Sequence, residues 1–147
     1  MSSALSHLRR LRHGEYSPLA YRRWLYTTLI LLLAVVATGA IVRLSGSGLG
    51  CDNWPRCGQL PVPTEAKTWH PIIEFSNRVF ALIAILTSVI TWLVARRVPG
   101  TLGWVRKLTG LVALLIVAQI PLGGVTVLTG LHPLAVMAHF LLTVVVL

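Results

Sequence analysis

The chain has 147 residues, of which 55% are hydrophobic and only 12% are charged, whereas charged residues make up about a quarter of an ordinary soluble domain. Its formal net charge of +9 does not indicate nucleic acid binding, because the basic residues flank apolar runs instead of interleaving with aromatic ones. These features exclude a soluble globular domain and predict an all-α integral membrane protein with several spans.

Residues 1–23 are polar and basic, with five arginines and only Glu15 opposing them. We expect this segment to be a cytoplasmic tail. The apolar run that follows, residues 24–43, is about as long as the ~20 residues that cross a bilayer. A basic start before an apolar run also fits a signal peptide, but this run is long and no small-residue cleavage site closes it, so a signal anchor is expected.

A loop rich in glycine and proline, residues 44–70, separates the first apolar run from the next. Two further spans are expected at residues 71–95 and 108–128, joined by a basic connection. A fourth span is expected from residue 134 to 147. Residues 24–147 are therefore expected to form a four-helix membrane domain. The fourth span is only roughly 20 Å long at 1.5 Å per residue, so it is either genuinely short or part of a truncated product.

The basic residues lie in the tail and in the connection between the second and third spans, while the other loops are nearly balanced. The positive-inside rule therefore places both termini in the cytoplasm and the loop 44–70 on the external side of the cell membrane. We expect this membrane to be a prokaryotic plasma membrane.

Residues 39–46 are similar to residues 123–130. The first stretch reads Gly-Ala-Ile-Val-Arg-Leu-Ser-Gly and the second Gly-Gly-Val-Thr-Val-Leu-Thr-Gly. Each ends a span and leads through an external loop into a helix with a polar residue near its outer end, Asn77 in one case and His139 in the other. The repeat predicts two similar helical hairpins packed as a bundle.

A stripe of polar residues occupies the start of the second span. His70, Glu74, Asn77 and Arg78 fall at i, i+4, i+7 and i+8, so they share one helix face. Such a stripe is costly in hydrocarbon, and it should face the bundle interior or a ligand. Glu74 and Arg78 form either a simple intrahelical ion pair or, in the functional alternative, a substrate site with Glu74 as a proton-handling or charge-stabilising carboxylate.

Arg43 and Arg78 both lie near the outer interface. In the functional alternative they hold an anionic ligand such as heme propionates. Snorkelling to lipid head groups also explains Arg43.

His139 is the only histidine well inside a span. A buried histidine is either a hydrogen-bonded filler or a ligand, and neutral imidazole is a common axial ligand for heme iron in helix bundles. Pro121, Gly123 and Gly124 in the third span indicate either close helix packing or room for a flat macrocycle. The residues alone leave both pairs of alternatives open.

Cys51 and Cys57 lie in the loop expected outside the membrane, where thiols oxidise. They can close a small disulfide ring; two free thiols are the alternative. The sequence does not separate a structural role for the disulfide from redox exchange with a partner.

Several motifs together resemble the heme A synthase family. They are Thr-Gly-Ala-Ile-Val-Arg-Leu-Ser-Gly-Ser-Gly-Leu-Gly-Cys at 38–51, Trp-Pro-Arg-Cys at 54–57, Ile-Glu-Phe-Ser-Asn-Arg at 73–78, Leu-Gly-Gly-Val-Thr-Val-Leu-Thr-Gly-Leu at 122–131 and Val-Met-Ala-His-Phe at 136–140. The resemblance implies an oxidoreductase that converts heme O to heme A by oxidising a porphyrin methyl group to formyl in two steps. It also implies heme b (iron protoporphyrin) as cofactor, and heme O synthase and the cytochrome oxidase assembly machinery as partners.

The family fold implied by this resemblance is two similar four-helix bundles, each with a heme-sized pocket between paired histidines. His139 then coordinates iron, Glu74 lies by the oxidised methyl, and Arg43 and Arg78 hold the propionates. The loop cysteines of the family look like Cys51 and Cys57.

The chain departs from the family pattern in two ways. Asn77 stands where the motif usually has a histidine, so either His139 binds iron alone or His70 substitutes. The chain also covers only the first bundle, which a homodimer would complete. The rivals to an enzyme are a non-catalytic heme-binding or assembly protein and an inactive N-terminal fragment. The sequence does not identify the electron donor.

Overall fold

The computed structural model describes residues 15–51, 54, 55, 57 and 69–147. Four helices account for most of this part of the chain: α2 (Pro18–Leu44), α3 (Trp69–Arg96), α4 (Gly103–Leu128) and α5 (Pro133–Val146). These described residues contain no strand, so the predicted all-α class is confirmed. The first part of the basic tail and most of the loop after Cys57 lie outside the described residues.

The helices extend beyond the predicted spans where local capping signals allow. α2 begins at Pro18, not at residue 24, because the Ser17 side chain accepts a hydrogen bond from the Ala20 N–H at 3.1 Å and proline suits the first helical turn. Arg22 and Arg23, assigned to the tail by their charge, therefore belong to α2. Three helices, α2, α3 and α4, are long and apolar enough to cross a membrane. α5 is apolar but has only 14 residues.

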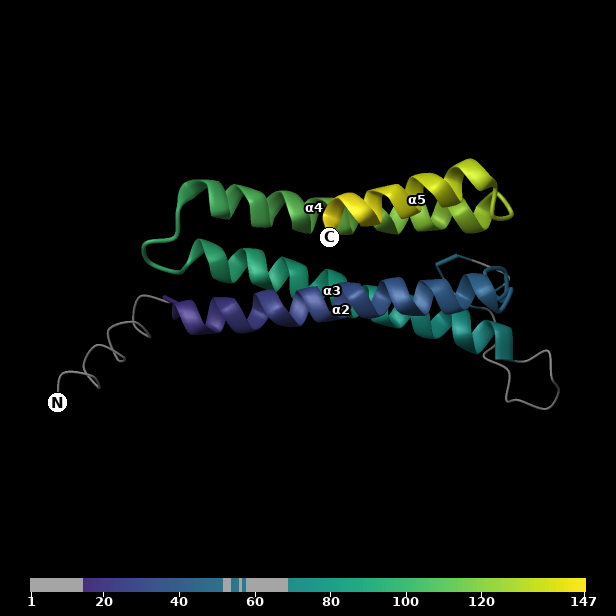
Figure 1. Ribbon diagram of the computed structural model, residues 1–147, viewed down its shortest axis with the longest axis horizontal. Coiled ribbons are helices and arrows are strands. Elements are labelled where there is room, and N and C mark those ends of the chain that lie inside the picture. Colours follow the sequence, from purple (N-terminus) through teal and green to yellow (C-terminus); the bar gives the residue numbers. More distant parts are fainter. Residues whose placement is uncertain (1–14, 52–53, 56, 58–68) are drawn as a thin grey trace.

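The helices form two antiparallel hairpins, as Figure 1 shows, with α2 and α3 in one and α4 and α5 in the other. Each helix packs against the next in chain order, and no other pair of the described helices packs closely. α5 runs back along α4 from the end that carries the turn between them (Figure 1). The hairpins are therefore joined through α3 and α4 and leave space between α3 and α5.

A pair of threonine hydroxyls lies in the contact of α2 with α3, and α3 carries a buried stripe of mostly small and hydroxyl side chains. A buried stripe on α3 recurs every three or four residues and consists of Ala84, Thr87, Ser88, Thr91, Val94 and Ala95. The hydroxyls of Thr28 and Thr91 lie 2.9 Å apart across the interface. Small residues let two helix backbones approach closely, and interhelical hydroxyl pairs add to the packing.

The same C-cap ends α2 and α4. In α2, Gly46 (φ +68°) follows the cap, and the Ser47 N–H donates to the Val42 carbonyl at 2.9 Å. In α4, Gly130 (φ +61°) follows the cap, and the Leu131 N–H donates to the Thr126 carbonyl at 2.8 Å. Both are Schellman motifs, in which a glycine adopts the left-handed conformation. The sequence repeat therefore has a structural counterpart in the two hairpins.

Candidate functional site

A cavity of about 580 Å³ lies between the two hairpins and is lined by side chains of all four described helices. Its volume is within the range of about 300–1,000 Å³ that is usual for small-molecule sites. Most of the lining is aliphatic. The polar side chains in the wall are Arg43, Glu74, Asn77, Arg78, Gln119, Thr126, His139 and Thr143.

His139 faces this cavity from α5. Its ring has no hydrogen-bond partner among the described residues, and its Nδ1 is buried. Gly123 of α4 lies against the ring, since a Cβ added at this glycine would be 3.4 Å from His139 Cε1. An unpaired imidazole nitrogen in an apolar site is costly, so His139 is a candidate ligand residue.

Asn77 takes the matching position in the first hairpin. A Cβ added at Gly39 would lie 3.8 Å from Asn77 Oδ1, and Gly39 and Gly123 occupy the same place in the sequence repeat. The two glycines thus face the two cavity residues in corresponding ways. Asn77 differs from His139 in having a partner, because the Thr38 hydroxyl donates to its Oδ1 at 2.7 Å. The cavity wall therefore contains the His139 imidazole on one side and, on the other, the Asn77 amide, whose oxygen is already hydrogen-bonded.

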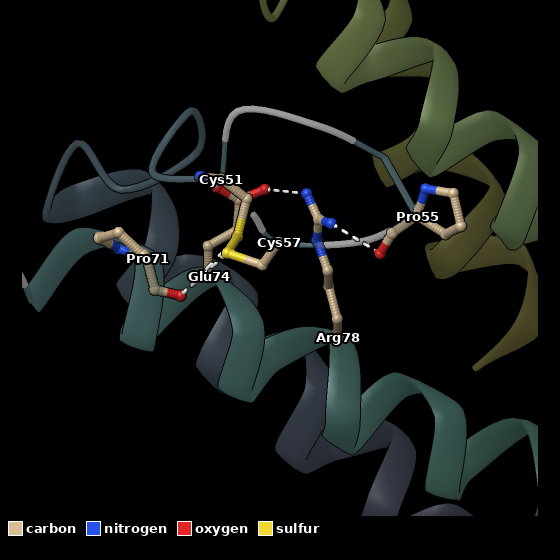
Figure 2. Close-up of a disulfide and its surroundings, with 6 residues drawn as sticks. All are labelled: Cys51, Pro55, Cys57, Pro71, Glu74 and Arg78. Atoms are coloured by element: carbon tan, nitrogen blue, oxygen red, sulfur yellow. Dashed lines mark hydrogen bonds and ion pairs between the residues drawn. A yellow bond between two sulfur atoms is a disulfide. The ribbon is translucent and has the colours of Figure 1, made fainter. Parts of the chain in front are cut away.

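Glu74 fastens the cysteine loop to α3, as Figure 2 shows. Its side chain is almost completely buried, with 4% of the residue exposed. Oε2 accepts from the Cys51 N–H at 2.9 Å, and Oε1 pairs with the Arg78 guanidinium, which also donates to the Pro55 carbonyl at 3.1 Å. The predicted intrahelical ion pair is present, and both carboxylate oxygens are engaged.

Cys51 and Cys57 are joined by a disulfide, with their Cα atoms 4.6 Å apart. The Cys51 sulfur lies 3.8 Å from the Pro71 carbonyl oxygen, so the disulfide sits on the first turns of α3 (Figure 2). Gly50 allows this approach, because a Cβ there would lie 2.5 Å from the His70 carbonyl carbon. The loop is thereby pinned to the helix that carries Glu74.

Trp54 extends the loop across to the other hairpin. A Cβ added at Gly124 of α4 would lie 3.0 Å from the indole, and Trp54 also lines the cavity. A tryptophan in a loop next to an apolar span is commonly explained by the aromatic belt at the membrane interface. The structure gives it a more specific position, over the cavity and against α4.

His70 does not line the cavity, although the other members of its predicted stripe do. Its Nδ1 lies 2.8 Å from the hydroxyl of Ser47, which is fully buried in the loop. The structure brings Glu74, Asn77, Arg78 and His139 to one cavity and directs His70 to the loop. This placement gives no support to His70 as the substitute iron ligand.

Arg43 and Arg78 are not equivalent. Arg78 is engaged by Glu74 and by the loop backbone. Arg43 lies in the last turn of α2, lines the cavity and is exposed. Its side chain makes no hydrogen bond or ion pair with the rest of the described chain. Arg43 is therefore the cation at the cavity that is available to an anionic group.

Gln119 was not singled out as a site residue from the sequence. Its Nε2 donates to the Thr143 hydroxyl at 2.9 Å, and that hydroxyl donates to the His139 carbonyl at 3.0 Å. Its Oε1 is buried and has no partner among the described residues. A polar side chain in the middle of an apolar span is itself a signal of function, and this signal was present in the sequence.

Two apolar hairpins with a ligand-sized cavity and an unpartnered imidazole between them define the chain as a multi-pass membrane protein with an internal cavity. The sequence profile of the COX15-CtaA family, described as "Cytochrome oxidase assembly protein", matches residues 22–147. The chain belongs to this family.

Curated relatives agree with this assignment. The Heme A synthase of Shewanella oneidensis is 33% identical over 133 residues, which cover 78% of this chain and 38% of the relative. That of Lysinibacillus sphaericus is 33% identical over 114 residues, covering 74% and 36%. That of Listeria welshimeri is 29% identical over 128 residues, covering 83% and 40%. The predicted resemblance is confirmed, and the chain spans 40% or less of the length of these relatives. No solved structure matches the chain.

Proposed function

We propose that the cavity binds heme with His139 as the iron ligand, and that the chain acts as an oxidoreductase converting heme O to heme A. The observation that carries this proposal is the His139 imidazole, which is without a partner in a cavity lined by all four helices. Leaving a buried polar group unpaired costs about 1–3 kcal/mol, and coordination of iron recovers this cost. Family membership and the name of the relatives support the same function.

The residues present fit a heme. The aliphatic cavity wall suits a porphyrin, the imidazole suits iron, and the exposed Arg43 suits a propionate. The hydrogen-bonded chain from Gln119 through Thr143 to the His139 carbonyl fixes this part of α5 against α4, as supporting residues do around metal ligands. When bound, heme supplies the redox-active iron that an oxidation needs.

Glu74 is proposed to stabilise positive charge at the methyl group that is oxidised. Its carboxylate lines the cavity, and both its oxygens accept hydrogen bonds from fixed donors. A carboxylate held in this way is suited to a fixed electrostatic role. Arg78 keeps it in place, and we assign Arg78 a secondary role in binding a propionate.

We further propose that the loop 44–70 lies outside the cell membrane and that the N-terminus is cytoplasmic. Arg22 and Arg23 lie near the start of α2, and Arg96 and Arg97 lie at the end of α3. These two helix ends lie at the end of the molecule opposite the α2–α3 loop (Figure 1), as the positive-inside rule requires. Heme O synthase would supply the substrate, and the cytochrome oxidase assembly machinery would take the product. A second copy of the chain would complete the two-bundle architecture.

The second candidate function is heme binding without oxidation, as in a delivery or assembly protein. Asn77 favours it, because the side chain opposite His139 is a neutral amide already bonded to Thr38, and a neutral amide is a poor iron ligand. Both candidates require heme in the cavity. The enzyme would convert heme O to heme A, whereas the binding protein would leave heme O unchanged.

Asn77→His is expected to convert the bound heme from five-coordinate to six-coordinate. Asn77 corresponds to His139 in the other hairpin, so a histidine there supplies the second imidazole. Absorption spectra of purified protein loaded with heme should change from high-spin to low-spin, with a sharper band set in the reduced state. The control is Asn77→Leu, which should keep the original spectrum. An unchanged spin state in Asn77→His would contradict the placement of the heme between these two residues.

A further inference from the structure

We propose that a basic pocket at the α3–α4 turn binds the phosphate of an anionic phospholipid. This pocket is separate from the heme cavity and does not depend on the function proposed above. It lies where α3 ends and α4 begins, at the end of the molecule opposite the disulfide loop (Figure 1). Its volume is about 520 Å³, and it is lined by Trp92, Arg96, Arg106, Lys107 and Gly110.

Every polar side chain in the lining is a hydrogen-bond donor. Arg96, Arg106 and Lys107 are cationic, and Trp92 offers only an indole N–H. Arg106 Nε is buried without a partner among the described residues, while its Nη2 donates weakly to the Val98 carbonyl at 3.4 Å. A ligand in the pocket would supply the acceptor that this guanidinium nitrogen lacks among the described residues. Phosphate oxygens, like carboxylate oxygens, are acceptors that match the guanidinium fork.

No carboxylate neutralises this pocket within the part of the chain that the structure describes. The ion pair found among the described residues joins Glu74 to Arg78, and it lies at the opposite end of the molecule from this pocket. Glu15 is exposed and pairs with none of the pocket cations. Residues 1–14 contain no aspartate or glutamate at all. The three charges therefore act together on whatever enters the pocket.

The Trp92 side chain packs against Gly110 in the wall of the pocket. A Cβ added at Gly110 would lie 2.8 Å from Trp92 Nε1, so the indole rests directly on the backbone of α4. The Arg96 guanidinium lies 5.1 Å from the centroid of the Trp92 ring, within the range of a cation–π contact. The arginine is thereby held at the rim. Topogenic charge alone explains the basic residues, but it does not require this arrangement.

The surroundings favour a lipid over free phosphate. Leu93 on α3 and Leu108 and Leu111 on α4 are exposed large apolar side chains next to the pocket in sequence. They belong to helices that are apolar enough to span a membrane, so acyl chains can lie along them while the phosphate occupies the pocket. Basic pockets between membrane helices are known to hold anionic lipid headgroups.

Native mass spectrometry of the full chain, purified with phosphatidylglycerol or phosphatidylcholine in matched micelles, tests this proposal. We expect wild-type protein to retain phosphatidylglycerol selectively. The triple variant Arg96→Gln, Arg106→Gln, Lys107→Gln should bind it roughly a hundredfold more weakly, since each charge near the surface contributes about fivefold. The matched control is Arg22→Gln, Arg23→Gln, Arg97→Gln, which removes as much charge from the same end outside the pocket and should retain the lipid.

Gly110→Ala provides a variant that keeps every charge. Alanine is a better helix former than glycine, so α4 should remain intact while the indole is displaced, and lipid retention should fall several-fold. Three results would overturn the proposal: unchanged retention in Gly110→Ala, equal loss in the control triple, or equal retention of phosphatidylcholine. Displacement of the lipid by glycerol 3-phosphate at equal concentration would assign the pocket to free phosphate esters instead.

Discussion

His139→Ala is expected to abolish heme binding by the purified protein. His139 is the imidazole in the cavity wall, and its ring nitrogens make no hydrogen bond within the described chain. Loss of an outer-shell partner already weakens metal binding by about 10–100-fold, so loss of the ligand itself should weaken it by at least about a hundredfold. The measurement is the heme-to-protein ratio after purification from cells supplied with heme.

His132→Ala is the matched control for this variant. His132 precedes α5 as its N-cap residue, is exposed and does not line the cavity, so its loss should leave heme content unchanged. His139→Ala removes a group without a partner, and helical content by circular dichroism should stay the same. Normal heme content in His139→Ala would show that another residue coordinates the iron.

Glu74→Gln is expected to stop heme A formation and to leave heme binding largely intact. Glu74 accepts hydrogen bonds from the Cys51 N–H and the Arg78 guanidinium. Glutamine keeps one oxygen that can accept from one of these donors, but it removes the negative charge at the cavity wall. Glu74→Ala should lose the same activity and also stability, because it removes one partner of a largely buried ion pair, a change that costs about 3–5 kcal/mol. Extraction and chromatography of membrane hemes measure the first effect, and thermal unfolding measures the second.

Glu15→Gln controls for the loss of a carboxylate, because Glu15 is exposed before α2. It should change neither heme A yield nor stability. If Glu74→Gln forms heme A at the normal rate, the charge of Glu74 has no part in the oxidation. Glu74 would then serve only to anchor the disulfide loop to α3.

The helices themselves were largely predictable from the sequence, because hydropathy marks where apolar surface is long enough to cross a bilayer. The predicted spans 24–43, 71–95 and 108–128 lie within α2, α3 and α4, which are long enough to cross a membrane. The fourth predicted span, 134–147, coincides with α5 to within a residue, but α5 has only 14 residues. The start of α2 was misplaced because the boundary was drawn where charge ends, whereas the helix is started by the Ser17 cap and Pro18. Charged residues indicate which part of the chain is exposed to solvent, whereas capping residues indicate where the backbone hydrogen bonds of a helix begin.

The candidate site was predictable in part. Helical periodicity correctly placed Glu74, Asn77 and Arg78 on one face, and they share a cavity with His139. The same periodicity could not show that His70 bonds to Ser47, because that depends on how the loop folds back on α3. The position of Trp54 on Gly124 likewise depends on a contact between residues distant in sequence. Periodicity describes one helix and carries no information about what packs on its end.

The glycines of the repeat indicate which polar residues correspond in the two hairpins. Gly39 and Gly123 each face the polar residue of their own hairpin, Asn77 or His139. The repeat therefore identifies Asn77 as the counterpart of the iron ligand proposed here.

The most direct test of the central claim is the heme composition of membranes that contain this chain together with a heme O synthase, determined by extraction and chromatography. We predict that heme A appears above the level of membranes that contain the heme O synthase alone. That result would show that this chain, with Asn77 in place of a second histidine, suffices for the oxidation. Heme O that accumulates with none converted would contradict the enzymatic function and favour a heme-binding protein.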